Sequence, residues 1–494
     1  MITETSVQNT SGKRVCIIGA GIAGLVTAKV FQADGFAVTL FEKQAELGGV
    51  WAASRTYPGL RANNPRETYA FSDYPYPATA DEYPTAEQVR SYLNAYADHF
   101  GIRPLIRLAT EVVAVASDAA GFEVIVQPTN GNAGAERIHF DFVVICNGVF
   151  SEPQIPHIEG QVQFAGPILH SSQVTDPAIV AGRRVVVVGA GKSALDCATW
   201  AANHQAQCTL VFRTAHWMAP RYFGGRIRAD RIFMTRATET LLRYHHLQGV
   251  EAFLHGPAKV WVRGWWRIQS EFLRRSLQIP AILTPETPLP AGFENIGIGG
   301  EFYAALQRGN LQLKRARIAR CVDATTLELD TGEKVAADVI ILATGWRQGL
   351  PFLSEELRQA IESNGYLRLY RHILPPRLPN LGFIGYASST ACQLTAEIGA
   401  HWLAQWFRGE LALGTVDEME QEIDRVLQWA AEIFPVRSQG YFIGPYVAHY
   451  LDDLLRDMGL PCRRTRHFWT EYFAPYWPDR YRDVSVERRQ SGRY

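Results

Sequence analysis

Two short segments of the chain repeat one pattern, and that pattern limits the possible folds more than any other feature. Arg14–Ala28 reads RVCIIGAGIAGLVTA, and Arg184–Ala198 reads RVVVVGAGKSALDCA. Each has an apolar β-branched run, a GxGxx(G/A) turn and a helix-like stretch, which is typical of a buried parallel strand that turns tightly into a helix. The sequence therefore predicts an α/β protein with two Rossmann-like dinucleotide-binding domains.

Two later apolar runs predict how these domains are connected. Phe142–Gly148 and Val339–Gly345 each follow an aspartate and end in small residues. We predict that both contain strands that return the chain to the sheet of the first domain. The second domain is then an insertion in the first. The predicted bounds are residues 12–160 and 326–480 for the first domain and residues 165–325 for the second.

Two parts of the chain depart from the Rossmann pattern. Residues 216–292 are rich in Trp, Arg and His and look helical in places, so we predict a helical insertion over the active site. The cluster Trp261, Trp265 and Trp266 within it fits either a substrate wall or a partner surface. Residues 481–494 are highly charged and are predicted to form a tail on the surface.

The first glycine turn has the features of an FAD site. Gly19 allows the tight turn, Gly21 lets the backbone approach a pyrophosphate, and Gly24 lets the helix pack against the strand. The next strand ends in an acid that can accept hydrogen bonds from both hydroxyls of a ribose without a 2′-phosphate. A second glycine pair follows, which suits FAD better than NAD. The predicted FAD contacts are Gly19, Gly21, Ile22, Ala23, Gly24, Glu42, Gly49, Val50, Trp51, Asn63 and Asn64.

The second glycine turn has the features of an NADPH site. Ala194 replaces the third glycine and is small enough for the same packing of helix on strand. The following strand, CTLVFR, ends in an arginine, which would accept a 2′-phosphate, whereas an acid there would repel it. The prediction is NADPH over NADH. The predicted contacts are Gly189, Gly191, Lys192, Ser193, Ala194, Arg213 and Thr214.

Two dinucleotide folds in one chain imply that a hydride passes from nicotinamide to flavin. The electrons then go either to a protein dithiol or to oxygen. A dithiol relay needs closely spaced cysteines, and the seven cysteines are scattered, without a CxxC pair. Oxygen is therefore the favoured acceptor. The cysteines show no spacing typical of zinc ligands, so we predict no metal and interpret most of them as small apolar core residues.

Composition and charge limit the classes of binding partner that we expect. Lys plus Arg (49) balances Asp plus Glu (49), which gives no electrostatic reason to expect nucleic acid or an anionic membrane. The first residues are polar and lack a signal-peptide pattern, and no apolar run approaches the roughly 20 residues of a membrane span. We expect a chain that works in the cytoplasm.

Several motifs together resemble the class B flavin monooxygenases, which include the flavin-containing and the Baeyer–Villiger monooxygenases. Between the two turns, Phe164–Ser171 reads FxGxxxHS, which is similar to the identifying motif of that family. The resemblance covers roughly residues 13–450 and includes GGVW after Glu42, NNPRETYAFSDYPYP, YLNAYADHF and LATGW. It implies FAD and NADPH as cofactors, O2 and a small molecule as substrates, and a homodimer as one expected assembly. In this motif His170 is expected to hold the interdomain linker by hydrogen bonds.

The motifs combine features of both branches of the family. Val174 departs from the pattern of both branches, and TYPGLRAN resembles Baeyer–Villiger enzymes except that they carry an aspartate near Asn63, where flavin-containing monooxygenases have asparagine. A neutral amide can hydrogen-bond a flavin hydroperoxide without favouring its anion. We therefore predict oxygenation of a nucleophilic nitrogen or sulfur through a C4a-hydroperoxyflavin, with Asn63 as the catalytic residue, although Asn-Asn-Pro is also a common turn composition.

Three alternatives stay open. A Baeyer–Villiger monooxygenase would convert a ketone to an ester with the same cofactors. A non-oxygenating NADPH-binding flavoprotein would use residues 216–292 as a docking surface, and a halide-oxidising enzyme would use the same flavin chemistry. Trp51 and Tyr57 are candidates to line the flavin pocket, although an aromatic residue beside a glycine turn is more often packed in the core. Glu397 and His401 lie one helical turn apart, but no third ligand supports a metal site there.

Overall fold

A five-stranded sheet carries the first glycine turn, in a computed structural model that describes residues 12–131, 134–291, 297–298, 300–434 and 439–491. The strands lie in the order β24, β7, β1, β2, β3, and every neighbouring pair is parallel. Asp141, just before β7, accepts a 2.7 Å hydrogen bond from the N–H of Arg14 in β1, which fixes the register of the two strands. The bounds are Leu381–Phe383 (β24), Phe142–Ile145 (β7), Arg14–Ile18 (β1), Ala37–Phe41 (β2) and Ile106–Arg107 (β3).

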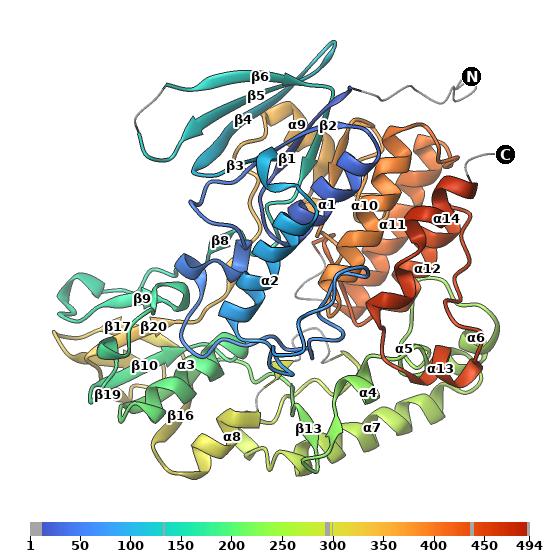
Figure 1. The fold of residues 1–494 in the computed structure, drawn as a ribbon. Helices are drawn as coiled ribbons and strands as arrows, with labels where there is room; N and C mark the ends of the chain where they lie inside the picture. Colours follow the sequence, from blue (N-terminus) through green and yellow to red (C-terminus); the bar gives the residue numbers. More distant parts are fainter. Residues whose placement is uncertain (1–11, 132–133, 292–296, 299, 435–438, 492–494) are drawn as a thin grey trace.

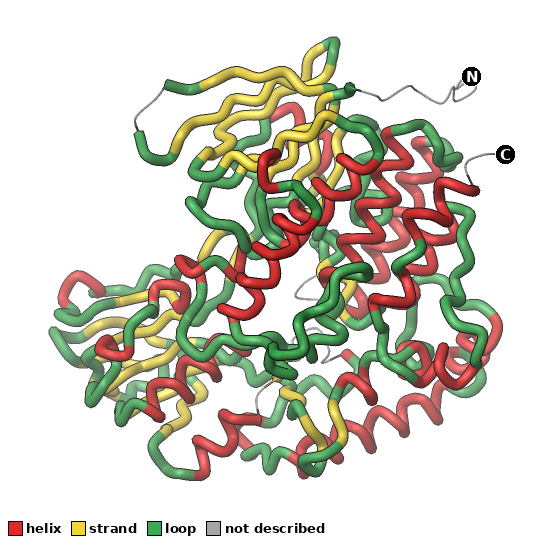
Figure 2. Tube along the Cα trace, in the orientation of Figure 1, coloured by secondary structure: helices red, strands yellow, loops and turns green. Residues whose placement is uncertain are grey.

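Helices cover this sheet and form most of the first domain's core (Figure 1). Helix α1 follows β1 directly and contacts α10, which in turn contacts α12. Helix α10 is buried along nearly all of its length, including its polar residues Glu397, His401 and Gln405. An antiparallel three-stranded sheet of β4, β5 and β6 lies beside the parallel one (Figure 2). The bounds are Ile22–Ala33 (α1), Ala86–His99 (α2), Cys392–Phe407 (α10), Val416–Ile433 (α11), Val447–Asp457 (α12), Thr110–Asp118 (β4), Gly121–Pro128 (β5) and Glu136–Phe140 (β6).

A second five-stranded sheet carries the second glycine turn. Its strands lie in the order β16, β11, β10, β20, β9, again all parallel, and helix α3 follows β10 directly. The predicted class, an α/β protein with two Rossmann-like domains, is confirmed. The bounds are Leu311–Arg315 (β16), Gln207–Phe212 (β11), Arg184–Val188 (β10), Val339–Leu342 (β20), Ile168–His170 (β9), Lys192–Asn203 (α3) and Gly300–Gln307 (α8).

The prediction for the strand at Val339–Leu342 is wrong, because the strand belongs to the second sheet and not to the first. Val185 pairs with Val339, and Asp338 accepts hydrogen bonds from the backbone and guanidinium of Arg184. Asp141 plays the same part for Arg14 in the first sheet. Since the two aspartates precede apolar runs of the same kind, the local pattern does not distinguish the sheets. The second sheet thus extends to residue 342, beyond the predicted boundary at 325.

The chain crosses between the two sheets in both directions at one place. The outgoing segment contains β8 (Glu152–Pro153) and the returning segment contains β21 (Trp346–Arg347), and these two short strands pair antiparallel. Thr344 adds a side-chain hydrogen bond to the backbone of Gln154. Both connections are therefore joined to each other.

Residues 216–291 form a helical layer along the lower edge of the molecule in Figure 1. Helix α5 joins this layer to the first domain, since Glu239 accepts hydrogen bonds from the N–H groups of Ala448 and His449 at the start of α12. Among the described residues, no helix has the length and apolar character to cross a membrane. The bounds are Met218–Ala219 (β12), Tyr222–Phe223 (β13), Ile227–Arg228 (β14), Asp230–Phe233 (α4), Arg236–Glu239 (α5), Gly249–His255 (α6) and Lys259–Ser276 (α7).

The charged C-terminal segment is anchored to the first domain. Helix α14 (Val484–Ser491) contacts α10, and its Arg488 is buried against Asp34 with 2.6 and 2.7 Å hydrogen bonds. The remaining elements are Gly297–Ile298 (β15), Ile318–Cys321 (β17), Thr326–Leu329 (β18), Lys334–Ala336 (β19), Glu355–Ile361 (α9), Glu362–Ser363 (β22), Tyr366–Leu367 (β23), Ser388–Ser389 (β25), Phe442–Gly444 (β26) and Phe468–Phe473 (α13).

Candidate active site

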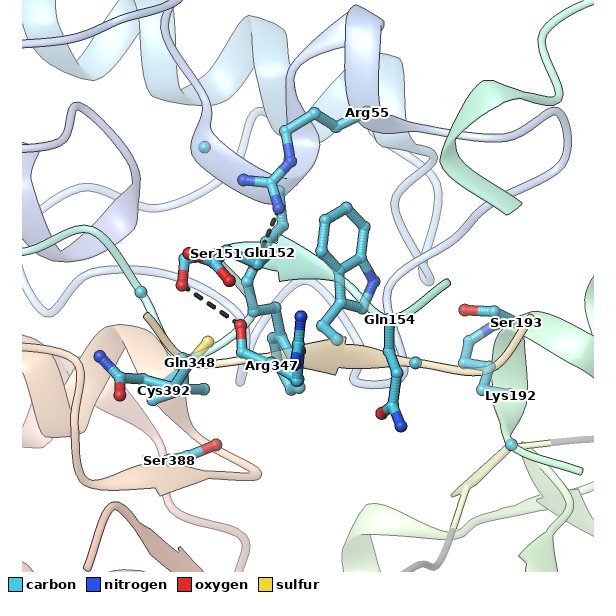
Figure 3. A pocket seen from close by; sticks show the side chains of 18 of the residues that line it. Arg55, Ser151, Glu152, Gln154, Lys192, Ser193, Arg347, Gln348, Ser388 and Cys392 are labelled. Atoms are coloured by element: carbon cyan, nitrogen blue, oxygen red, sulfur yellow. Dashed lines mark hydrogen bonds between the residues drawn. The ribbon is translucent and has the colours of Figure 1, made fainter. Parts of the chain in front are cut away.

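Both glycine turns open into one cavity of about 1980 Å³. It runs from the carboxyl ends of β1 and β2 past the connection between the sheets to the carboxyl ends of β10 and β11. Figure 3 shows part of its lining, including Lys192 and Ser193 from the second turn and Cys392 from α10. Ligands of open parallel sheets bind at these strand ends, so the fold places the cavity where two nucleotides would be expected.

The first turn is shaped by close backbone approaches. Gly19 has φ +104, and a Cβ there would lie 2.7 Å from the carbonyl oxygen of Cys146. A Cβ at Gly24 would lie 1.8 Å from the oxygen of Gly19, so the helix reaches the strand only with glycine at this position. Gly21 and Gly49 approach each other, since a Cβ on Gly49 would lie 3.0 Å from the Gly21 Cα. No side chain caps the N-terminus of α1, which leaves its first N–H groups for a phosphate.

Glu42 lies at the end of β2, as the sequence predicts, and is nearly buried at the wall of the cavity. Its carboxylate accepts hydrogen bonds from the N–H groups of Ala20 (2.8 Å) and Gln44 (2.9 Å). These bonds fix its orientation and use part of its acceptor capacity, so it can still accept from hydroxyl groups. The residues at this end therefore fit an adenosine with a free ribose.

The two asparagines after the YPG turn have different surroundings. Asn64 is buried and its Nδ2 donates a 2.5 Å hydrogen bond to the carbonyl of Thr390, which fixes the loop against the segment before α10. Asn63 is exposed to the cavity, and its amide makes no hydrogen bond to a described residue. Of the two, Asn63 is the one with an amide available to a ligand.

Of the two aromatic candidates for the flavin pocket, only Trp51 lines the cavity. The Trp51 Nε1–H donates to the hydroxyl of Tyr69 at 3.1 Å, so both rings form one wall. Tyr57 instead lies in the core of the second domain, and its hydroxyl donates to Asp196 of α3 at 2.8 Å. Tyr57 is therefore a packing residue, because its ring connects the two domains and does not face the cavity.

The second turn repeats the geometry of the first. Gly189 has φ +135, and a Cβ there would lie 2.4 Å from the carbonyl oxygen of Ala343. Gly191, Lys192 and Ser193 line the cavity, and no side chain caps the N-terminus of α3. Ala194 is buried beneath the turn, which agrees with its predicted packing role and leaves it no cavity surface.

Arginines gather where β11 and its neighbour β16 end. Arg213 and Thr214 line the cavity as predicted, and Arg317 lines it from the end of β16. Arg315 is held by Glu286 and by the carbonyl of Arg213, whereas neither Arg213 nor Arg317 forms an ion pair with a described residue. The sequence does not distinguish Arg317, because its only signal is its position just after the segment LQLKR.

A family model described as flavin-binding monooxygenase-like matches residues 12–255 and 296–471. The chain belongs to this family. It is therefore an oxidoreductase of the flavin monooxygenase class, as the motifs predict.

Individual proteins agree with this membership. The chain is 27% identical to a probable flavin-containing monooxygenase 1 of Arabidopsis thaliana, over 97% of this chain and 98% of that protein. It has the fold of the S-allyl-L-cysteine S-oxygenase from Allium sativum, with a TM-score of 0.63, 22% identity and coverage of 98% and 95% of the two chains. It also has the fold of an oxidised steroid monooxygenase bound to NADP, with a TM-score of 0.68, 22% identity and coverage of 97% and 98%.

The identifying motif of this flavin monooxygenase lies at the connection between the sheets. The His170 ring bonds to the carbonyl of Gly345 through Nε2 (3.1 Å) and to the hydroxyl of Ser172 through Nδ1 (2.9 Å). Burial lowers the pKa of His170, so the ring is neutral near pH 7. Trp346 forms a T-shaped contact with the His170 ring, and the guanidinium of Arg55 lies over the Trp346 ring, 4.5 Å from its centre. His170 thus holds the linker, as expected, and Arg55 is a cavity residue that the motifs did not reveal.

Glu397 and His401 have separate structural roles in α10. Glu397 accepts hydrogen bonds from the N–H and hydroxyl of Ser72, and the Arg488 Nε–H donates to His401 Nδ1 at 3.0 Å. Burial, and then the Arg488 charge, lower the pKa of His401, which agrees with a neutral acceptor. These contacts leave no metal site at this pair.

One other group among the described residues, His245, His246 and Asp453, has metal-like spacing. Arg456 lies 2.8 Å from the Asp453 carboxylate and Arg371 lies 3.7 Å from it. These two positive charges already compensate Asp453 and oppose a cation.

Proposed function

We propose that the chain is an NADPH- and O2-dependent flavoprotein monooxygenase that oxygenates a nucleophilic nitrogen or sulfur of a small organic substrate. One observation carries the proposal: a single cavity is lined by both glycine turns and by the neutral amide of Asn63. The overall reaction balances, because substrate, O2, NADPH and a proton give oxygenated substrate, water and NADP⁺.

The residues around the cavity fit FAD at the first turn. Gly19, Gly21 and the free N–H groups of α1 would hold its pyrophosphate, and Glu42 would accept from its ribose. Bound FAD supplies the hydride acceptor and the activation of oxygen. Trp51 and Tyr69 keep one wall of the cavity apolar and exclude water from it.

The second turn fits NADPH by the same criteria. Gly191 has open space where a Cβ would stand, which leaves room for a pyrophosphate against the backbone. Arg213 and Arg317 give two cations for the 2′-phosphate, with no acid beside them on the cavity wall from β11 or β16. Tyr57 and Lys192 both donate hydrogen bonds to the carboxylate of Asp196. This carboxylate therefore links Tyr57, which comes from the first part of the chain, to the start of α3.

Asn63 distinguishes the two kinds of oxygenation. Its amide can donate a hydrogen bond to a bound oxygen group without adding a charge that favours an anion. A ketone substrate needs an anionic nucleophile, whereas an amine or thioether attacks a neutral electrophile. The neutral amide of Asn63 therefore supports heteroatom oxygenation over conversion of a ketone to an ester.

The test is substrate-dependent turnover of the purified holoenzyme. NADPH oxidation is followed with a thioether, a tertiary amine and a cyclic ketone, with catalase present and product oxygen traced by ¹⁸O2. We expect one labelled oxygen in a sulfoxide or N-oxide and little ester. Labelled ester would favour the Baeyer–Villiger alternative, and NADPH oxidation that no substrate raises would contradict an oxygenase.

A further inference from the structure

An unpartnered apolar surface lies on the helical layer of residues 216–291. Helix α7 buries one stripe, with Val262, Trp266 and Leu273, in the core of the second domain. A second stripe, Trp261, Trp265, Ile268 and Phe272, repeats at the same helical spacing but faces solvent, with Trp261 83% exposed. A surface helix of a globular protein normally has one apolar stripe, so the second stripe needs a separate explanation.

The apolar surface continues beyond α7. Helix α6 contacts α7 and exposes Val250 and Phe253. His449 bridges Glu251 of α6 and Glu239 of α5, and α5 contacts α13, where Phe468, Trp469 and Phe473 are exposed. Figure 1 shows α6, α7 and α13 along the same lower edge of the molecule. We call these exposed residues, with the α7 stripe, the α7 surface.

The charges of these segments are strongly biased although the whole chain is neutral. Residues 249–276 and 463–473 contain three acids, Glu251, Glu271 and Glu471, and each is already ion-paired inside the protein. Five exposed basic residues make no ion pair with a described residue. They are Lys259, Arg263, Arg267, Arg463 and Arg466.

We propose that the α7 surface binds an anionic lipid bilayer, with the tryptophan and phenylalanine rings in the headgroup region and the unpaired basic residues near the lipid phosphates. Exposed aromatic rings beside Lys and Arg are the chemistry of interfacial helices. A second copy of the chain fits less well, because a symmetric contact would bring the same unpaired cations together. The binding is peripheral and does not depend on the proposed reaction.

The test is cosedimentation of the purified protein with vesicles. Wild type is mixed with vesicles of phosphatidylcholine alone or of equal parts phosphatidylcholine and phosphatidylglycerol. We expect binding to the anionic vesicles that weakens with salt and is low on the neutral ones. The double variant W261S/W265S is expected to lose at least about tenfold in partitioning. The double variant R263Q/R267Q is expected to lose about fivefold for each charge.

Two controls make the result decisive. Val162, which is 91% exposed and lies outside this surface, is replaced by V162S and is expected to bind like wild type. Quenching of wild-type tryptophan fluorescence by nitroxide-labelled lipid reports contact without any substitution. Wild type that stays in the supernatant with both vesicles overturns the proposal. A dimer in sedimentation velocity that W261S/W265S dissociates, without vesicle binding, overturns it too and identifies a contact between copies.

Discussion

At the scale of single residues, Asn63 offers a direct test of the chemistry, because its amide faces the cavity without another described partner. We expect N63D and N63L to release about tenfold more hydrogen peroxide per NADPH consumed, since each removes one hydrogen-bond donor worth roughly 1 kcal/mol or more. The measurement is the ratio of peroxide to NADPH with a saturating thioether. N64A is a poor control because Asn64 fixes the loop. An unchanged ratio in both Asn63 variants removes the residue from the mechanism.

A second residue-scale prediction concerns Arg213 and Arg317. We expect R213Q and R317Q each to raise the Kd of NADP⁺ by about tenfold or more and to leave the Kd of NAD⁺ unchanged, because each removes a charge-assisted hydrogen bond to a 2′-phosphate. Titration calorimetry with NADP⁺ and NAD⁺ measures both constants. R320Q is the control, since Arg320 is paired with Glu328 and does not line the cavity. Equal weakening of both nucleotides would point to a distorted fold instead.

At the scale of elements, α14 is held by a buried ion pair. Arg488 and Asp34 are both nearly inaccessible, so R488L leaves a buried carboxylate without its partner. Breaking such a pair costs about 3–5 kcal/mol, and we expect a clearly lower Tm. R489A removes the half-exposed neighbour, which lies 3.5 Å from the same carboxylate, and is expected to cost less than about 1 kcal/mol. Similar Tm values for the two variants would show that α14 contributes little to stability.

The helices and strands also show how much of the fold can be predicted from the sequence. The glycine turns, the strand–helix units and Glu42 at the end of β2 were predicted because backbone sterics and phosphate binding both leave local signatures. The predicted sheet for strand β20 is wrong, because an aspartate precedes an apolar run in both sheets. The positions of Arg317 and Tyr57 do not follow from the sequence for a different reason. Their surroundings come from residues more than 100 positions away, such as Asp196 for Tyr57 and β11 for Arg317.

At the scale of the whole molecule, His449 joins the helical layer to the first domain through Glu239 (2.6 Å) and Glu251 (2.7 Å). Burial opposes the charge, but the two carboxylates raise the pKa of His449 to about 10. A group whose pKa rises on folding stabilises fully below its unfolded pKa, about 6.5, and loses that effect as the pH approaches the folded value. We therefore expect H449Q to lower the Tm most near pH 6 and least near pH 10. A Tm difference that is the same at both pH values contradicts a charged His449.

The pairing of β8 with β21 limits how the two domains can move. Two independent connections would let the sheets twist, slide and separate. Because β8 and β21 are hydrogen-bonded to each other, the two connections act as one unit. We expect this pair of strands to bend but not to stretch. The two domains would then rotate about a single hinge axis. The cavity extends from this connection into both domains. Opening it would move the second glycine turn along an arc, and a cofactor held there would return to the same place at each closure.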